Sequence, residues 1–95
     1  MTETKTIPWK TEDHLETAED IAAYLEAVFD AGDPELIGYA LGTVSRSKGM
    51  TEIARRTGLG RQSLYKALSP EGRPEFATVL KVVRALGLKL TVTAA

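Results

Sequence analysis

The chain has 95 residues, of which 43% are hydrophobic and 26% charged, and this length accommodates one small domain. It contains no cysteine, which excludes disulfides and thiolate metal sites. No apolar run approaches the roughly 18 residues of a membrane span. The polar start of the chain lacks the apolar stretch of a secretory signal. We therefore expect a single-domain cytoplasmic protein.

The net charge of −1 conceals an uneven distribution along the chain. Residues 1–35 carry ten acidic residues and two lysines, a net charge of −8, whereas residues 36–95 carry ten basic and three acidic residues, a net charge of +7. Such asymmetry suggests two different partners, one of them an anion such as DNA. Alternatively, the two halves attract each other within the fold.

The first part of the chain is predicted to be an arm followed by a helix. Residues 1–16 show no sustained period, so we expect an N-terminal arm there and a single domain over residues 17–95. Thr17 is expected to cap the first helix, with Asp20 completing a capping box, and Gly32 to end it. Its expected buried stripe comprises Ile21, Leu25, Val28 and Phe29.

A second helix is predicted directly afterwards. Asp33 is a favourable cap, Pro34 suits the first helical position, and Gly49 is expected to end the helix. The residues that recur at helical spacing and form its expected apolar face are Leu36, Ile37, Ala40, Leu41 and Val44.

Two short helices are predicted in the middle of the chain. The first covers residues 52–57, capped by Thr51 and closed by Gly58, and the second covers about residues 61–68. A turn follows, because the composition Ser-Pro-Glu-Gly is typical of turns.

The last helix is predicted to begin at Pro74 and to end at Gly87. Its expected buried stripe comprises Phe76, Val79, Leu80, Val83 and Leu86. Residues 88–93 then alternate between apolar and polar, which is typical of a half-buried β-strand. A lone strand needs a partner, and the same strand of a second molecule would supply one and form a homodimer. Alternatively, the tail packs its leucines against the helices.

Residues 50–69 carry the pattern of a helix-turn-helix motif. Ala54 is small where the second helix would cross the first, and Gly58, four residues later, can adopt the positive φ that the turn needs. Apolar residues that would hold the two helices together are Ile53, Leu59, Leu64 and Leu68. The alternative is an ordinary helix pair within a bundle.

The second helix of this motif would present its N-terminal end to DNA. Arg61 can bind guanine bidentately, Gln62 can bind adenine, and Ser63 can hold a phosphate with the helix N-terminus. Arginines of the preceding helix would meet the DNA backbone. The candidate DNA-binding residues are Thr51, Arg55, Arg56, Gly60, Arg61, Gln62, Ser63, Tyr65 and Lys66. Alternatively, the charged residues among these candidates are solvated surface charges without a partner. Tyr65 could instead lie partly in the core.

The chain resembles the addiction-module antidote proteins, the HigA-like antitoxins of the Xre-type helix-turn-helix group. The segments that carry the resemblance are 49–54, 58–59, 63–70 and 74–88, with shorter matches at 8–9, 20–25 and 32–34. Two departures stand out, since Lys10 occupies a position that is often acidic in the family and Gly60 replaces a usual serine cap.

The predicted elements together indicate an all-α fold, a five-helix bundle with a lambda-repressor-like helix-turn-helix and a short C-terminal β-strand. The resemblance implies the antitoxin of a type II toxin-antitoxin module, which neutralises a RelE/HigB-like ribonuclease toxin and represses its own operon as a dimer bound to operator DNA. An RNA-binding toxin should be basic, so the acidic part of the chain would cover it. The candidate toxin-binding residues are Trp9, Glu16, Glu19 and Asp20. Trp9 could equally cap the core of the chain itself.

Neither an enzyme, nor a cofactor, nor a metal site is expected from the sequence. The single histidine, His14, lies beside Asp13 and Glu16 and is interpreted as part of a solvated cluster. Two alternative functions stay open. The chain could be a stand-alone helix-turn-helix transcriptional regulator without a toxin partner, or a protein-interaction module that has lost DNA binding.

Overall fold

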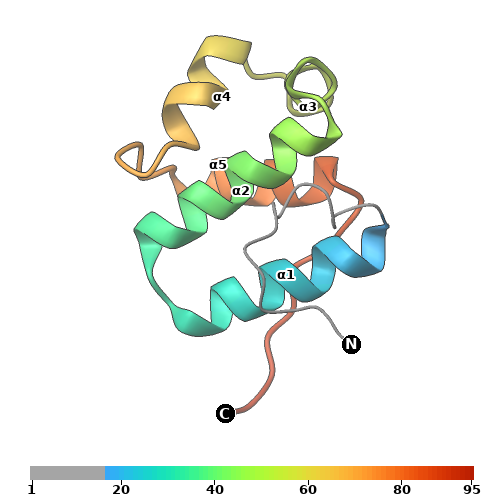
Figure 1. Cartoon of the computed structure of the whole chain (residues 1–95), viewed down its shortest axis with the longest axis vertical. Helices are drawn as coiled ribbons and strands as arrows, with labels where there is room; N and C mark the ends of the chain where they lie inside the picture. Colours follow the sequence, from blue (N-terminus) through green and yellow to red (C-terminus); the bar gives the residue numbers. More distant parts are fainter. Residues whose placement is uncertain (1–16) are drawn as a thin grey trace, which may run out of the picture.

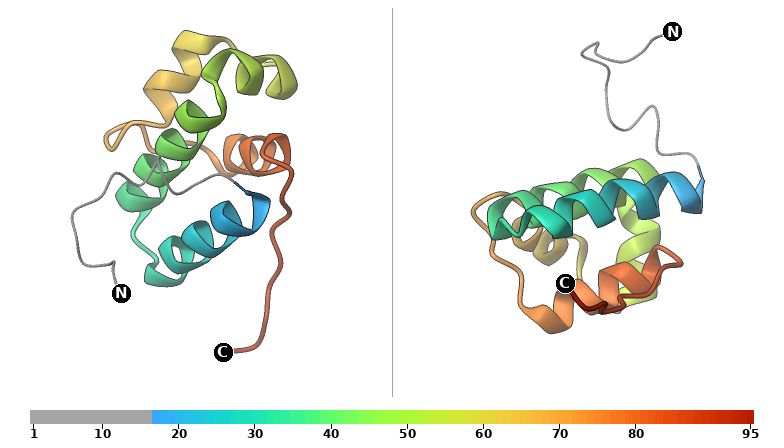
Figure 2. Two further views of the ribbon diagram at one scale, coloured as in Figure 1. Left: turned by 45° about the vertical axis from the view of Figure 1, so that its right-hand side comes forward. Right: turned by 90° about the horizontal axis from the view of Figure 1, so that it is seen from below.

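The computed structural model describes residues 17–95, and this part of the chain is all-helical. Its helices are α1 (Ala18–Ala31), α2 (Pro34–Lys48), α3 (Met50–Thr57), α4 (Arg61–Ala67) and α5 (Phe76–Ala85). Helices α1 and α2 pack side by side and antiparallel, and α3 contacts α2, α4 and α5 (Figure 1). The α3–α4 pair and α1 lie at opposite ends of the domain, with α2 and α5 between them (Figures 1 and 2).

The starts of α1 and α2 follow the predicted caps. The Thr17 hydroxyl accepts a hydrogen bond from the Asp20 amide (3.0 Å), and the Asp20 carboxylate accepts one from the Thr17 amide (3.3 Å). Asp33 accepts a hydrogen bond from the Glu35 amide (3.0 Å), and Pro34 is the first residue of α2. The capping box and the Asp33-Pro34 start are therefore confirmed.

The starts of α3 and α5 differ from prediction. Helix α3 begins at Met50 after Gly49, so Thr51 lies within its first turn and is not its cap. Helix α5 begins at Phe76 and not at Pro74, because Glu75 still has extended backbone (φ −66°, ψ 156°). Both expectations were wrong by one or two residues. A threonine that resembles a cap also fits inside a first turn, and the fixed φ of proline suits extended backbone as well as a helix start.

The hydrophobic core draws on all five helices of the described part. Its largest fully buried apolar side chains are Ile21, Leu41, Val44, Ile53, Leu64, Leu68 and Val82. Two predicted core residues are exposed instead, Leu36 at 39% and Phe76 at 69% of their surface. Both lie in the first turn of their helix. Both residues therefore follow the helical spacing of the apolar positions, but no neighbouring element covers either side chain.

A close approach to α2 fixes the end of α4. A Cβ on Gly42 would lie 2.4 Å from the carbonyl oxygen of Leu68, and one on Gly38 would lie 3.3 Å from that of Ser69. The side chain of Leu68 is buried as well. The two glycines of α2 therefore admit the chain as it leaves α4, and this contact holds α4 against the rest of the domain.

The C-terminal tail forms no strand in the described part of the chain. Gly87 ends α5 as predicted, and the Leu88 amide donates a hydrogen bond to the Val83 carbonyl (3.1 Å). Leu88 packs against the core, whereas Val92 is almost fully exposed, and residues 89–95 run past α1 (Figure 1). The predicted strand is absent because residues 17–95 supply no neighbouring strand to pair with. None of the helices among these residues is long and apolar enough to span a membrane.

Candidate nucleic-acid interface

The connection between α3 and α4 is fixed by local hydrogen bonds. Gly58 has a φ of +77°, which glycine tolerates, and its amide donates to the Ala54 carbonyl (2.9 Å). The Thr57 hydroxyl donates to the Ile53 carbonyl (2.8 Å) and accepts from the Leu59 amide (3.2 Å). Figure 1 shows α3 nearly along its axis and α4 from the side, so the two helices cross steeply. The turn thereby sets the direction in which α4 projects.

Helix α4 has one buried side and one polar, exposed side. Leu64 is buried within it, and Leu68 is buried at its end. Six of the candidate DNA-binding residues are exposed along or just before the helix: Gly60, Arg61, Gln62, Ser63, Tyr65 and Lys66. The Arg61 guanidinium lies over the Tyr65 ring, 5.7 Å from its centroid, and 43% of Tyr65 is exposed. The structure therefore brings these residues together at one surface.

The arginines of α3 are held by an acidic residue that the sequence prediction had left out. Arg56 Nε donates to Glu52 (2.7 Å), and Arg55 donates to both oxygens of the same carboxylate. These hydrogen bonds, from Arg55 first and Arg56 second, lower the pKa of Glu52 below its ordinary value of 4.5. The i,i+3 and i,i+4 spacing to the arginines could have revealed this cluster.

The two arginines differ in what else they contact. Arg56 also donates to the Ala85 carbonyl at the end of α5 (3.1 Å), so it ties α3 to α5. Arg55 is the more exposed of the two, with 70% of its side chain accessible against 54% for Arg56. Thr51 is exposed in the first turn of α3. Arg55 and Thr51 therefore stand at the surface, whereas Arg56 has a structural contact of its own.

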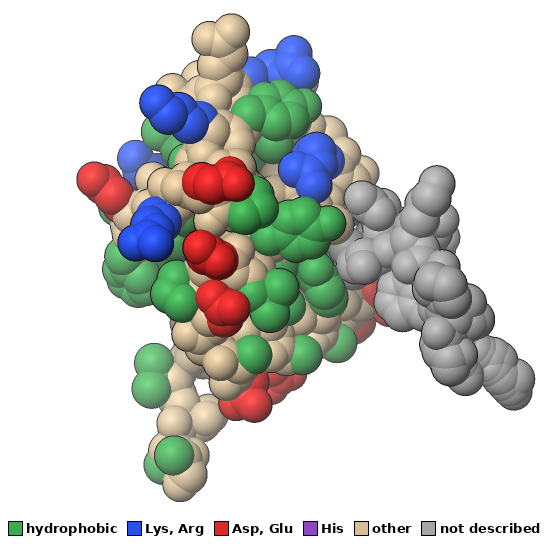
Figure 3. Space-filling view, turned by 60° about the vertical axis from the view of Figure 1, so that its left-hand side comes forward, with side chains coloured by type: hydrophobic (Ala, Val, Ile, Leu, Met, Phe, Trp, Pro, Cys, Tyr) green, Lys and Arg blue, Asp and Glu red, His purple; other side chains and the backbone are tan. Residues whose placement is uncertain are grey.

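The acidic residues gather at the other end of the domain. Glu19 and Asp20 are exposed in the first turn of α1, and the Asp20 carboxylate also serves the capping box. Trp9, His14 and Glu16 lie outside the described residues. Figure 3 shows Lys and Arg side chains over the α4 part of this face, whereas acidic side chains extend from among them to the α1 end, next to exposed hydrophobic ones.

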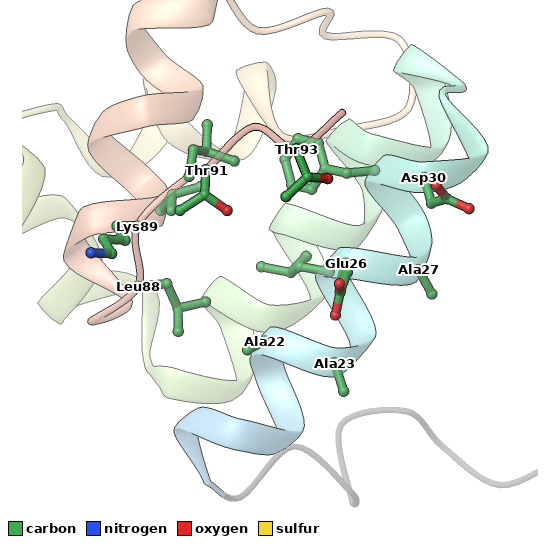
Figure 4. Close-up of a pocket in the computed structure, with 13 residues that line it drawn as sticks. Ala22, Ala23, Glu26, Ala27, Asp30, Leu88, Lys89, Thr91 and Thr93 are labelled. Atoms are coloured by element: carbon green, nitrogen blue, oxygen red, sulfur yellow. The ribbon is translucent and has the colours of Figure 1, made fainter. Parts of the chain in front are cut away.

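A groove lies between α1 and the C-terminal tail, and its lining is largely apolar with two acidic side chains from α1. It has a volume of about 850 Å³, and α1 contributes Ala22, Ala23, Glu26, Ala27 and Asp30 to its lining (Figure 4). The tail contributes Leu88, Lys89, Thr91 and Thr93. Glu26 and Asp30, four residues apart on one helix face, were not among the predicted toxin-binding residues. Their spacing relative to Glu19 would have placed them on the same side of α1.

Comparison with known proteins shows the family of the chain. The family model described as "probable addiction module antidote protein" matches residues 5–94. A Haemophilus influenzae protein described as an uncharacterized protein is 46% identical over 80 residues, which cover 84% of this chain and 82% of that relative. No solved structure matches the chain. The match over nearly the whole length shows that the chain belongs to the addiction module antidote family, and so has a toxin-antitoxin role.

Proposed function

We propose that this chain is a HigA-like, Xre-type antitoxin of a type II module, which neutralises a RelE/HigB-like ribonuclease toxin and represses its own operon in the cytoplasm. Membership of the antidote family supports a toxin partner over the stand-alone regulator. In this proposal α3 and α4 form the helix-turn-helix, and the chain acts by binding rather than by catalysis.

The observation that carries the DNA-binding part is the two-sided character of α4. Its leucines are buried while Arg61 and Gln62 are exposed at its start, where recognition helices meet base edges. Arginine suits guanine and glutamine suits adenine in the major groove. Residues 50–69 carry four basic residues and one acidic residue, a balance that favours contact with phosphates.

The remaining candidates take positions around that helix. Ser63, Tyr65 and Lys66 are proposed to contact the DNA backbone or base edges from α4. Thr51 and Arg55 are proposed to reach phosphates from α3. Gly60 has no side chain, so we propose that the backbone at the start of α4 approaches the DNA closely there. Arg56 is proposed to position α3 through its hydrogen bond to the Ala85 carbonyl.

The toxin-binding part rests on charge. Residues 17–35 contain six acidic residues and no basic one. A basic ribonuclease would be steered toward this surface, which would then cover its RNA-binding face. We propose that Glu19 and Asp20 take part from α1, with Glu26 and Asp30 beside them, and Trp9 and Glu16 from the preceding segment.

A homodimer is proposed to form through residues 88–93. The tail leaves Val92 almost fully exposed, and pairing with its two-fold copy would bury that side chain and satisfy the strand backbone. A symmetric dimer would also present two copies of α4 to a palindromic operator. Light scattering at micromolar concentration should then give twice the 10.3 kDa of one chain, and a mass of one chain would contradict the dimer.

Co-expression with the small basic protein encoded beside this chain tests the toxin-binding proposal. The two proteins should co-purify, and the chain should restore growth that its neighbour inhibits. Glu19→Lys and Glu26→Lys should weaken the complex, while Glu71→Lys, an exposed site in the α4–α5 connection, should leave it intact. DNA binding without any such complex would favour the stand-alone regulator instead.

A further inference from the structure

One carboxylate in the candidate interface faces two cations that DNA would also attract. Glu52 lies in the first turn of α3 and accepts hydrogen bonds from the guanidinium groups of both Arg55 and Arg56. It is the one acidic residue within residues 50–69. A DNA phosphate and this carboxylate offer an arginine the same kind of charged acceptor.

We infer that Glu52 is a built-in competitor of DNA phosphate for Arg55, and that it holds the DNA affinity of the chain below what its arginines would allow. The inference rests on the proposed DNA binding and goes beyond it, because it assigns a regulatory residue that does not itself touch DNA.

Arg55 is the exchangeable partner of the two. In the part of the chain that the structure describes, Glu52 is its one ion-pair partner and 70% of its side chain is accessible. Arg56 is kept in place by the Ala85 carbonyl whether or not Glu52 holds it. Competition with phosphate therefore acts at Arg55, while Arg56 continues to join α3 to α5.

The competition has a signature in the salt dependence of binding. An arginine that reaches a phosphate from solvent releases about one condensed counterion from DNA. If Arg55 stays with Glu52 in part of the wild-type complexes, it neutralises a phosphate only in the others, and the average release at that contact falls below one counterion. The wild-type chain should therefore show a shallower salt dependence than a variant in which Arg55 is already free.

The same carboxylate also supports the start of α3. Gly49 provides no side-chain cap there, and an acidic residue in the first turn stabilises a helix through its dipole. The residue thus stabilises a helix that the proposed interface needs, while it lowers the affinity of that interface. A variant must separate these two effects.

The test measures fluorescence anisotropy with a labelled duplex from upstream of the chain's own gene and a random duplex of equal length, over a range of salt concentrations. The proteins are the full chain with Glu52→Gln, Arg55→Gln or both. Glu52→Gln should raise the DNA affinity about twofold to fivefold, which corresponds to the free energy of an exposed ion pair. The slope of log affinity against log salt should steepen by at most about one. In the Arg55→Gln variant, adding Glu52→Gln should raise the affinity clearly less, because only the repulsion between Glu52 and phosphate is then removed.

Two controls separate competition from simple charge removal and from loss of fold. Glu71→Gln removes an acidic residue from the α4–α5 connection and should change the salt slope much less. Glu52→Asp keeps the charge but shortens the side chain, so it should also tighten binding if the contact with Arg55 matters. Thermal melts show whether each variant is folded.

Three results would overturn the inference. They are an unchanged affinity in Glu52→Gln and Glu52→Asp, an equal gain of Glu52→Gln with and without Arg55, and an absence of DNA binding by every protein including wild type. The third would overturn the proposed DNA binding as well, whereas the first two leave it standing.

Discussion

The α1–α2 pair and the α3–α4 pair begin their helices in different ways. Thr17 and Asp33 cap α1 and α2 with their side chains, and acidic residues occupy both first turns. Helices α3 and α4 begin after Gly49 and Gly60, and neither glycine can offer a side-chain cap. The two pairs also differ in charge, since residues 17–48 carry six acidic and two basic residues, whereas residues 50–69 carry one acidic and four basic residues.

This difference links stability to the proposed function. A carboxylate near a helix start stabilises the helix, but it also repels phosphate. The acidic end can use such residues freely because its proposed partner is basic. The α3–α4 pair has given up side-chain caps and obtains its order from buried leucines, the Gly58 turn and the close approach to α2.

The largest expected effect removes the buried support of α4. Leu64 is fully buried, so Leu64→Ala should lower the free energy of unfolding by about 2–5 kcal/mol and abolish DNA binding with it. Leu36→Ala is the matched control. Because Leu36 is 39% exposed, this variant should lose far less of the free energy of unfolding. Chemical denaturation measures both variants. Equal losses would mean that the packing of α4 does not hold the interface.

A smaller effect breaks the cap of the acidic end. Thr17→Ala removes the hydroxyl that accepts the Asp20 amide and should cost about 1 kcal/mol, or about 4–8 °C in Tm. Thr51→Ala is the same change in the first turn of α3, where the threonine side chain does not cap the helix. The free energy of unfolding of this variant should lie within about 0.5 kcal/mol of the wild-type value. A larger loss at Thr51 would show that α3 does begin with a side-chain cap.

The contribution of Glu52 to the stability of α3 should depend on pH. Its folded pKa lies below 4.5 because Arg55 and Arg56 favour the ionised carboxylate. Its contribution to stability is therefore present above pH 4.5 and is lost as the pH falls through the lower folded pKa. The Tm difference between wild type and Glu52→Gln should shrink in acid. A difference that is constant with pH would contradict the ion pairs.

The smallest effect concerns the uncapped start of α4. A Cβ on Gly60 would meet only the Ser63 hydroxyl, at 3.9 Å, so serine fits there. Gly60→Ser should add a cap and raise stability by a few tenths of a kcal/mol. The contrasting change is Gly58→Ser, which should destabilise because Gly58 has a φ of +77°. Scanning calorimetry of the two variants should give Tm shifts of opposite sign.

Features that depend on neighbouring residues were predictable from the sequence. The capping box of Thr17 and Asp20, the Asp33-Pro34 start and the glycines that end α1 and α3 each involve residues within four positions of one another. Such interactions need only residues that are close in the chain, so the local pattern can indicate them. The same kind of pattern misplaced the starts of α3 and α5 by one or two residues.

Features that depend on distant residues were not predictable in the same way. The exposure of Leu36 and Phe76 depends on which elements cover the first turns of α2 and α5. The Arg56 contact exists only because α3 packs on the end of α5, and the sequence gives no sign of it. A strand over residues 88–93 needs a partner strand, and residues 17–95 contain none. The DNA-binding and toxin-binding roles of individual residues stay predictions.

The most direct test of the central claim is a titration of DNA from upstream of the chain's own gene at two salt concentrations. Wild type should bind it specifically and more weakly at the higher salt. Arg61→Ala and Gln62→Ala should each relax specificity by about 1–3 kcal/mol, while Lys81→Ala, on the exposed side of α5, should not. Absence of specific binding by wild type, even as a dimer, would contradict the account and assign the basic surface to a protein partner.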